Sequence, residues 1–360
     1  MRPGAAMRTI EVSRILKVVE TTADAGRQIA EALAVLAVRR PAVFCGPGRT
    51  RELAEQIVGM LGAAAPLLVV REASARESER LEAEVTRLES DAIVAVGGGS
   101  VLDTGKFVAA RLGMAVVAVP TQISHDGIVS PVAVIRDGDN RKRSLAATMP
   151  AAVIAPLHWI QDAPTPMLLA GIGDLLSNFS AIEDWRLAQD HQRDRFDDFS
   201  AFLARHAARS VLRSLLQGAP VRSRDFVLEL LEGLMLSGLA MAIAGTSRPC
   251  SGSEHLISHA LDYLYGGVAA HGLQVAAATV PMLLLQGQDG LARDVFRVYR
   301  ALNMPTSLPD LGLTRDQIVE VVRQAPRMRP GRFTILDVAT PSQVERVLKA
   351  PVPSCWPATP

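Results

Sequence analysis

The stretch that decides the fold runs Asp91-Ala-Ile-Val-Ala-Val-Gly-Gly-Gly-Ser100. An apolar run of strand length leads directly into three glycines, and a helix-like segment over residues 101–111 follows. Glycine has no Cβ, so the backbone can turn sharply there and approach a ligand closely. The N-terminus of the following helix offers free N–H groups and the positive end of the helix dipole, which together bind phosphate. The stretch therefore favours a phosphate-binding loop. Ser100 could cap the helix or donate a hydrogen bond to a phosphate oxygen. An ordinary tight turn fits the glycine triplet equally well.

The residues around this stretch repeat the same alternation of strand and helix. Four apolar runs have strand length, and two segments between them place apolar residues three or four apart among charged ones. Uninterrupted apolar strands that alternate with helices indicate a parallel sheet covered on both faces. We therefore predict an α/β domain. The predicted strands are residues 42–45, 67–70, 92–96 and 115–119, and the predicted helices are residues 51–61 and 78–88.

The character of the chain changes after Pro156, because few strand-like runs follow it. Long segments with helical periodicity dominate instead. We expect an α/β domain over residues 1–160 and an all-helical domain over residues 161–360, with a poorly ordered tail from Ala350 to Pro360. The predicted helices of the second domain are residues 166–191, 199–216, 223–244, 253–265, 273–285 and 291–302.

The overall composition excludes several classes of protein. The 360 residues include 38 Lys+Arg and 37 Asp+Glu, a balance that argues against a nucleic-acid binder. Three cysteines at wide spacing fit neither a disulfide framework nor a cysteine-rich zinc site, so we expect a reducing compartment. The N-terminus has no apolar core of signal-peptide length. The longest uncharged stretches, Gly233–Ser247 and Gly272–Gln288, are shorter than the roughly 20 residues of a membrane span, so we expect buried helices and no membrane partner.

A second polar loop follows the next predicted strand, with the sequence Pro120-Thr-Gln-Ile-Ser-His-Asp-Gly127. In open α/β sheets, ligands bind beyond the carboxyl ends of the strands, so this loop and the glycine loop are expected to share a site. The glycine loop matches neither G-x-x-x-x-G-K-[ST] nor G-x-G-x-x-G. Asp103 and Lys106 lie on one face of the following helix and could serve the site or pair with each other.

Candidate metal ligands occur at three places in the helical half. Asp174 follows two glycines, His255 and His259 share one helix face, and His271 precedes an apolar helix. The Ser251-x-x-Glu254 spacing of a capping box predicts the start of the helix that carries the first two histidines. A catalytic metal needs two or three such ligands and an open position. Each histidine alone is nevertheless more often a core or capping residue, and the spacing leaves both readings open.

Taken in order, these motifs resemble those of sn-glycerol-1-phosphate dehydrogenases. These enzymes belong to a superfamily of metal-dependent group III alcohol dehydrogenases, glycerol dehydrogenases and dehydroquinate synthases. The resemblance covers roughly residues 40–280, and its most specific parts are Ser124-His-Asp-Gly127 and Ser251-Gly-Ser-Glu-His255. The other parts are Gly97–Lys106, Pro120–Pro131, Ala170–Asn178, Ser247–Cys250 and His271-Gly272.

The resemblance implies a Rossmann-like domain, a helical domain and a site in the cleft between them. It implies a cytoplasmic, homo-oligomeric oxidoreductase that uses NAD or NADP and one divalent metal, zinc with iron or nickel as alternatives. Its substrate would be a small phosphorylated ketone or polyol, most simply dihydroxyacetone phosphate and sn-glycerol 1-phosphate. The implied metal ligands are Asp174, His255 and His271. The implied cofactor residues are Gly97, Gly98, Gly99, Ser100, Val101, Asp103, Thr121, Ser124 and Ser130, and the implied catalytic residues are Asp126, His259 and Lys106.

Several questions stay open at this stage. Lys142 and Arg143 lie on an expected hairpin turn, where they could clamp a substrate phosphate or simply face solvent. Arg71 favours NADP, whereas Glu72 favours NAD. Ser100 stands where the family commonly has lysine. The alternatives are a dehydrogenase of another polyol or cyclitol phosphate, a dehydroquinate-synthase-like lyase, or a nucleotide-binding scaffold without metal.

Overall fold

A six-stranded parallel sheet forms the first half of the molecule. The computed structural model describes residues 15–61, 65–139 and 141–349, so the predicted tail and Cys355 lie outside the described residues. The strand order is β1-β8-β5-β4-β2-β3, and every neighbouring pair is parallel, which confirms the predicted sheet. The strands are β1 (Ile15–Val19), β2 (Pro41–Cys45), β3 (Leu67–Val69), β4 (Ala92–Gly97), β5 (Ala115–Pro120) and β8 (Ala152–Pro156).

Helices cover both faces of this sheet, because successive side chains of a strand point to opposite faces. In β4, Val94 and Val96 pack in the cluster that contains α1 and α2, whereas Ile93 and Ala95 pack in the cluster that contains α3 and α4. Both faces of β4 are fully buried, as its uninterrupted apolar run predicts. The covering helices are α1 (Thr22–Val35), α2 (Arg49–Leu61), α3 (Ala75–Arg87) and α4 (Gly99–Leu112).

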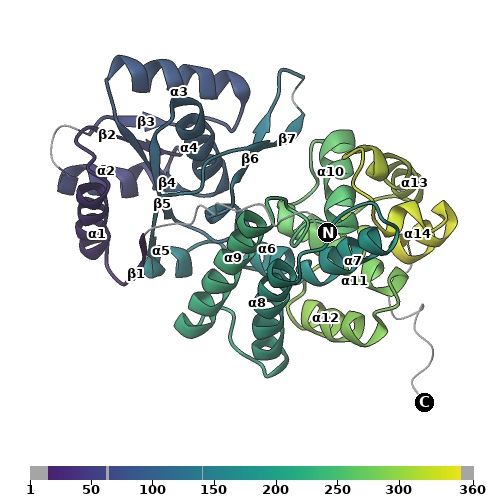
Figure 1. Ribbon diagram of the computed structural model, residues 1–360. Helices are drawn as coiled ribbons and strands as arrows, with labels where there is room; N and C mark the ends of the chain where they lie inside the picture. The colour runs from purple at the N-terminus through teal and green to yellow at the C-terminus, as the bar shows by residue number, and fades with distance from the viewer. Residues whose placement is uncertain (1–14, 62–64, 140, 350–360) are drawn as a thin grey trace, which may run out of the picture.

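Between β5 and β8 the chain leaves the sheet and forms an antiparallel hairpin of β6 (Val132–Arg136) and β7 (Lys142–Ala146). Figure 1 shows this hairpin beside the helical half. Lys142 and Arg143 begin β7, so the expectation that they lie on the turn itself is wrong.

The second half is helical from α5 (Leu157–Gln161) onward, and no strand follows β8 in the described part of the chain. The predicted helix over residues 166–191 is two helices in the structure, with Ser177 between them. The helices are α6 (Thr165–Leu176), α7 (Asn178–Asp190), α8 (Asp198–Leu216), α9 (Arg224–Ala244), α10 (Ser253–Tyr265), α11 (His271–Leu285), α12 (Asp289–Ala301), α13 (Arg315–Gln324) and α14 (Pro341–Lys349).

One described helix, α9, is long and apolar enough to cross a membrane by length and composition alone. In the structure 67% of its most apolar window is buried, and α9 packs against α8 and α6 in the main hydrophobic cluster. These contacts are those of the core helix of a globular protein.

Candidate functional site

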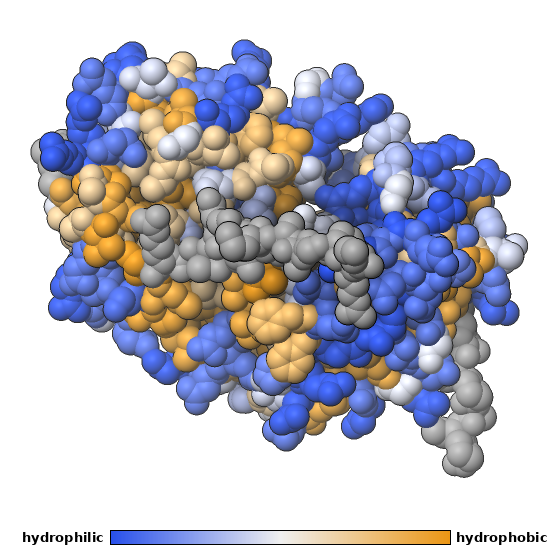
Figure 2. Space-filling view, in the orientation of Figure 1, coloured by the Kyte–Doolittle hydropathy of each residue, from blue (hydrophilic) through white to orange (hydrophobic). Residues whose placement is uncertain are grey.

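A cleft of about 1230 Å³ lies where the two halves of the molecule meet. One wall consists of the loops after β4 and β5 and the β6–β7 hairpin, and the other consists of residues from α6, α10, α11 and the segment after α13. Figure 2 shows part of this hollow, with hydrophilic residues on the side of the helical half and more apolar residues on the side of the sheet. The carboxyl ends of parallel strands therefore open onto the cleft, as in other doubly wound sheets.

The glycine loop lies at the floor of the cleft on the sheet side. The Thr121 amide donates to the Gly97 carbonyl at 3.0 Å, so the loops after β4 and β5 are joined. Helix α4 begins at Gly99 with Gly98 as its N-cap, and no side chain caps it. Of the two roles open to Ser100, capping the helix or donating to a phosphate oxygen, the structure excludes the first, and Ser100 is exposed in the cleft.

Two side chains of the second loop lie directly against the glycines. A Cβ built on Gly99 would lie 2.3 Å from Nε2 of His125, and one on Gly98 would lie 2.5 Å from Nε2 of Gln122. A larger residue at either position would displace these side-chain ends, so the glycines permit this close approach. Gln122 falls within the segment 121–124 that the resemblance places at the nicotinamide, whereas His125 has no predicted role, since only the fold brings the second loop against the first.

Lys106 does not face the cleft, which corrects its assignment as a catalytic group. Its side chain is 1% exposed, and Nζ donates to the carbonyls of Gly127 and Val132 at 2.6 Å each. Nζ also pairs with Asp103 Oδ1 at 3.1 Å, while Asp103 Oδ2 accepts from the Val134 amide at 3.0 Å. The Asp103–Lys106 pair thus ties α4 to the second loop and to the hairpin. Of the two, only Asp103 lines the cleft.

The three predicted metal ligands come together on the opposite wall. Ligand atoms of Asp174, His255 and His271 all lie within 4.8 Å of one another. Nε2 of His255 lies 3.5 Å from Asp174 Oδ1, and Nε2 of His271 lies 3.8 Å from the same oxygen. Two ligands held about 2.1 Å from one ion at a tetrahedral angle are about 3.4 Å apart. The arrangement therefore fits a single divalent ion.

Close packing of α6 on α11 sets this arrangement. A Cβ on Gly173 would lie 2.3 Å from the Gly272 carbonyl oxygen, and a Cβ on Gly272 would lie 1.9 Å from the Ala170 carbonyl oxygen. The two backbones can touch only because both positions are glycine. The contact brings Asp174, which follows Gly173, beside His271, which precedes Gly272.

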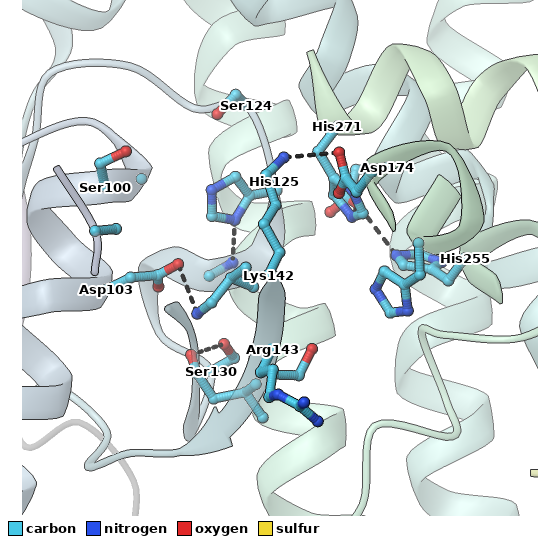
Figure 3. Close-up of a pocket in the computed structure, with 18 of the residues that line it drawn as sticks. Ser100, Asp103, Ser124, His125, Ser130, Lys142, Arg143, Asp174, His255 and His271 are labelled. Carbon is cyan, nitrogen blue, oxygen red and sulfur yellow. Dashed lines mark hydrogen bonds and ion pairs between the residues drawn. The ribbon is translucent and has the colours of Figure 1, made fainter. Parts of the chain in front are cut away.

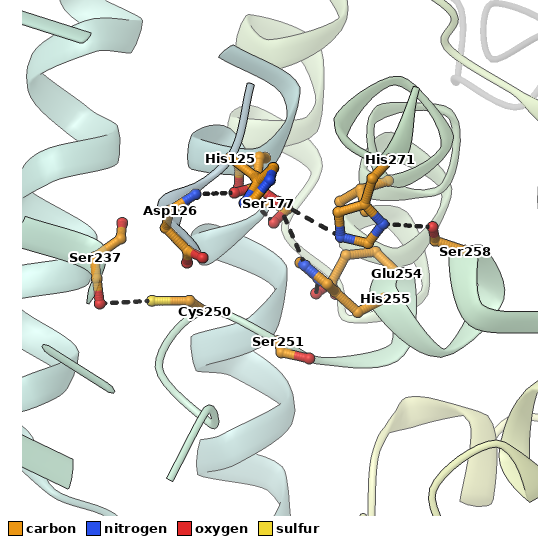
Figure 4. A network of polar contacts seen from close by, with 12 residues as sticks. His125, Asp126, Ser177, Ser237, Cys250, Ser251, Glu254, His255, Ser258 and His271 are labelled. Carbon is orange, nitrogen blue, oxygen red and sulfur yellow. Dashed lines mark hydrogen bonds and ion pairs between the residues drawn. The ribbon is translucent and has the colours of Figure 1, made fainter. Parts of the chain in front are cut away.

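Polar groups behind the triad orient its two imidazole rings. Glu254 Oε1 lies 2.9 Å from Nδ1 of His255, and Ser258 Oγ lies 3.1 Å from Nδ1 of His271 (Figure 4). Both Nε2 atoms are left to face Asp174, which is the usual way in which outer hydrogen bonds orient metal-binding histidines. The predicted capping box is wrong, because α10 has Gly252 as its N-cap and Glu254 accepts from the Gly252 amide at 2.7 Å.

The charges of the triad suit exchange of a proton for a metal ion. Burial alone lowers the pKa of His255, but its interactions with Asp174 and Glu254 outweigh burial and raise the pKa to about 9. Burial and the charge of His255 lower the pKa of His271 to about 4. Burial would raise the pKa of Asp174, yet the two histidines lower it overall. The raised pKa favours the protonated form of His255 at neutral pH, so this ring must lose a proton when it binds a metal ion.

Asp126 and His259 lie on either side of the triad. The Asp126 amide donates to Asp174 Oδ2 at 2.9 Å, and burial together with the Asp174 charge raises the pKa of the Asp126 carboxyl well above its usual range. The His259 ring centroid lies 6.2 Å from the centroids of both His255 and His271. Burial and these two histidines lower the pKa of His259, which leaves its ring neutral.

The remaining predicted residues line the cleft at different depths. Figure 3 shows Ser100 and Asp103 on one side and the triad on the other, with His125 between them. Lys142 Nζ pairs with Asp262 at 2.8 Å across the two halves, whereas Arg143 pairs with Asp137 on its own hairpin. The other cleft-lining residues with predicted or open roles are Arg71, Glu72, Gly98, Gly99, Val101, Thr121, Ser124 and Ser130.

Comparison with known proteins shows similarity over most of the chain. Residues 20–164 match the iron-containing alcohol dehydrogenase family. The chain is 42% identical over 267 residues to a glycerol-1-phosphate dehydrogenase [NAD(P)+] of Hyperthermus butylicus, covering 74% of this chain and 75% of that protein. It is 38% identical over 282 residues to the protein of the same name from Archaeoglobus fulgidus, covering 78% and 80% respectively.

Solved structures with the same fold cover nearly the whole chain. A probable glycerol dehydrogenase from Sinorhizobium meliloti is similar with a TM-score of 0.77 and 26% identity, over 95% of this chain and 97% of that one. An iron-containing alcohol dehydrogenase from Corynebacterium glutamicum is similar with a TM-score of 0.76 and 19% identity, over 96% and 97%. The second similarity shows the fold alone.

Proposed function

Because the chain belongs to the glycerol-1-phosphate dehydrogenase family, within the iron-containing alcohol dehydrogenases, we propose that it interconverts dihydroxyacetone phosphate and sn-glycerol 1-phosphate. The protein is a metal-dependent oxidoreductase that uses a nicotinamide dinucleotide. The observation that carries the proposal is the convergence of Asp174, His255 and His271 opposite a glycine loop in one cleft. The distances between these ligand atoms and the orienting bonds to their rings fit a divalent ion.

The metal and the nicotinamide, when bound, supply Lewis acidity to the ketone oxygen and a hydride to its carbon. We propose zinc as the ion, with iron or nickel as alternatives, since two imidazoles and one carboxylate suit all three. Asp174, His255 and His271 would hold it.

The other residues position the reactants and handle the proton. His259 is neutral beside the triad, so its ring can accept the proton of the alcohol when the alcohol is oxidised. In the reduction it would relay to the product oxygen a proton that it takes from solvent. Asp126 keeps its proton, so its carboxyl can donate a hydrogen bond to a substrate oxygen without adding negative charge.

The cofactor would lie along the sheet side of the cleft. The start of α4, with Gly98 and Gly99, offers backbone N–H groups to the pyrophosphate, whereas Gly97 is buried at the end of β4 and does not line the cleft. We place the nicotinamide half against Thr121, Ser124 and Ser130, because these residues line the cleft between the glycine loop and the metal triad. Arg71 and Glu72 both line the distal end and leave either NAD or NADP as the cofactor.

We further propose a cytoplasmic homo-oligomer whose domains divide near residues 156–165. The division is supported by the end of the last sheet strand at Pro156 and by the helices that follow. The cytoplasmic location is supported by the two described cysteines, which are free.

The proposed function is tested by following NADH and NADPH oxidation with dihydroxyacetone phosphate before chelation, after chelation, and after addition of Zn²⁺, Fe²⁺ or Ni²⁺. We expect turnover to be lost on chelation and restored by one of these ions. Net consumption of the reduced cofactor separates this reaction from that of a lyase that uses NAD transiently. Absence of metal-dependent turnover with this ketone would refute the proposal.

A further inference from the structure

Two arginines from the segment after α13 converge on one neutral oxygen at the edge of the cleft. Nη1 of Arg329 donates to Ser247 Oγ at 2.8 Å, and Nη2 of Arg332 donates to the same oxygen at 2.9 Å. Arg332 also donates to the carbonyl of Ser251. Two cations are thus held within a few ångströms of each other by groups that carry no charge.

Among the residues that the structure describes, no carboxylate forms a direct ion pair with Arg329 or Arg332, and the charges of Glu254 and Asp194 act on Arg332 only from a distance. Asp194 pairs with the neighbouring Arg248 at 2.6 Å, and Glu254 accepts from the Gly252 amide, Ser180 and His255. Burial, reinforced by the neighbouring arginines, lowers the pKa of Arg332 to about 9, and the same causes lower the pKa of Arg329. Both arginines are half-buried, and a half-buried pair of like charges is costly unless an anion accompanies it.

Arg329 opens onto the same cleft as the metal triad, and Arg332 is joined to it through Ser247. Arg329, Ser247 and Ser251 line this cleft together with His255 and His259. His259, whose ring lies 6.2 Å from the rings of His255 and His271, lines the cleft together with Arg329. An anion on Arg329 would therefore share the cleft with these three rings.

The other cations considered for this role already have partners. Lys142 pairs with Asp262, whose side chain is only 5% exposed, and Arg143 pairs with Asp137 on the hairpin. Asp262 and Asp137 therefore already offset the charges that these two cations would offer to a phosphate.

Resting on the proposed function, we propose that Arg329 and Arg332 bind the phosphate group of the substrate while its carbonyl end lies at the metal triad. Guanidinium groups match phosphate oxygens in geometry and form strong charge-assisted hydrogen bonds with them. The pair thus selects phosphorylated ketones over their uncharged counterparts. A merely structural role, in which the pair tethers the segment after α13 to the loop of residues 247–251, predicts no such selection.

The test compares Arg329→Gln with wild type on dihydroxyacetone phosphate and on unphosphorylated dihydroxyacetone. We expect KM for the phosphorylated ketone to rise about 10- to 100-fold, as for loss of one charge-assisted hydrogen bond. Kinetics with dihydroxyacetone should change less than about twofold, and Arg329→Lys should recover part of the loss. Arg323→Gln, on the exposed part of α13, is the matched control and should leave both substrates unaffected.

An unchanged KM for the phosphorylated ketone, or an equal loss for both ketones, would overturn the inference. Arg332→Gln, with thermal unfolding recorded beside it, repeats the test from the second arginine.

Binding of inorganic phosphate, measured by calorimetry on wild type and Arg329→Gln, separates the two proposals. If wild type binds phosphate through Arg329 but does not turn over dihydroxyacetone phosphate, the anion site stands and the proposed substrate fails. If wild type binds no phosphate, the anion site itself is refuted.

Discussion

Each residue of the metal triad has a charge state set by the other two. Asp174 is ionised, His255 is the protonated partner, and His271 is neutral. Removing one ligand therefore disturbs the electrostatics of the remaining pair as well as the coordination.

His271→Ala is expected to abolish stoichiometric metal binding and to lower turnover at least about a hundredfold, because the ion would keep only two protein ligands. Elemental analysis of the purified variant measures the first effect. His206→Ala, at an exposed position of α8, is the control and should keep its metal. A full metal complement in His271→Ala would remove His271 from the ligand set.

Metal affinity is expected to rise by about tenfold per pH unit up to about pH 9, the pKa of His255. The ion needs a neutral imidazole, so a proton must leave His255 when metal binds below this pH, and falling pH favours the proton. Calorimetry of metal binding at pH 7 in buffers of different ionisation enthalpy should report release of about one proton. Metal binding with no proton release would contradict the charge state assigned to the triad.

At the scale of elements, the contact between α6 and α11 decides whether the triad forms. Gly272→Ala places a methyl group 1.9 Å from the Ala170 carbonyl oxygen, so the two helices must separate. We expect loss of bound metal and of activity in a protein that still folds. Gly290→Ala, where a Cβ meets nothing within 4 Å, is the control. Normal metal content in Gly272→Ala would show that helix spacing does not set the site.

The elements that the sequence predicted best are those with a strong, uniform pattern. The predictions matched strands β4 and β5 and the helix over residues 253–265 almost to their ends. A strand buried on both faces is an uninterrupted apolar run, and a helix buried along one side repeats its apolar residues every three or four positions. Strands β1 and β8 were missed. β1 is an edge strand with Lys17 in its middle, and its side chains are mostly exposed or half-buried.

The break between α6 and α7 was missed for a local reason. Ser177 donates its hydroxyl hydrogen to the Asp174 carbonyl at 2.7 Å, and such bonds bend helices without altering the apolar pattern. Asp174, His255 and His271 were named as ligands from the family resemblance. Spacing could not show their proximity, because no local rule links residues on α6, α10 and α11. The burial of Lys106 was equally hidden, since the carbonyls it binds come from a distant loop and hairpin.

At the scale of the molecule, the metal joins three helices that belong to two hydrophobic clusters. Helices α6 and α11 contribute to the larger cluster, while α10 and another face of α11 contribute to the cluster that also holds α13 and α14. An ion bound to all three helices should stabilise the whole helical half against unfolding.

Removal of the metal is therefore expected to lower the midpoint of thermal unfolding by several degrees. Ligand at a hundred times its Kd stabilises a folded protein by about 2.7 kcal/mol. Differential scanning calorimetry with and without chelator measures the shift, and His271→Ala should show none. An identical midpoint for the metal-loaded and metal-free wild type would mean that the ion does not couple these helices.

The placement of the ligands on α6, α10 and α11 also has a consequence for biosynthesis. A ribosome releases Asp174 long before His255 and His271, so the growing polypeptide holds an incomplete set of ligands until α11 has emerged. The sheet and its glycine loop, encoded earlier, are complete by then. With the proposed ligands, metal can be bound in full only after α11 has been made, and a translation product that stops before His271 would carry the whole sheet but lack a complete metal site.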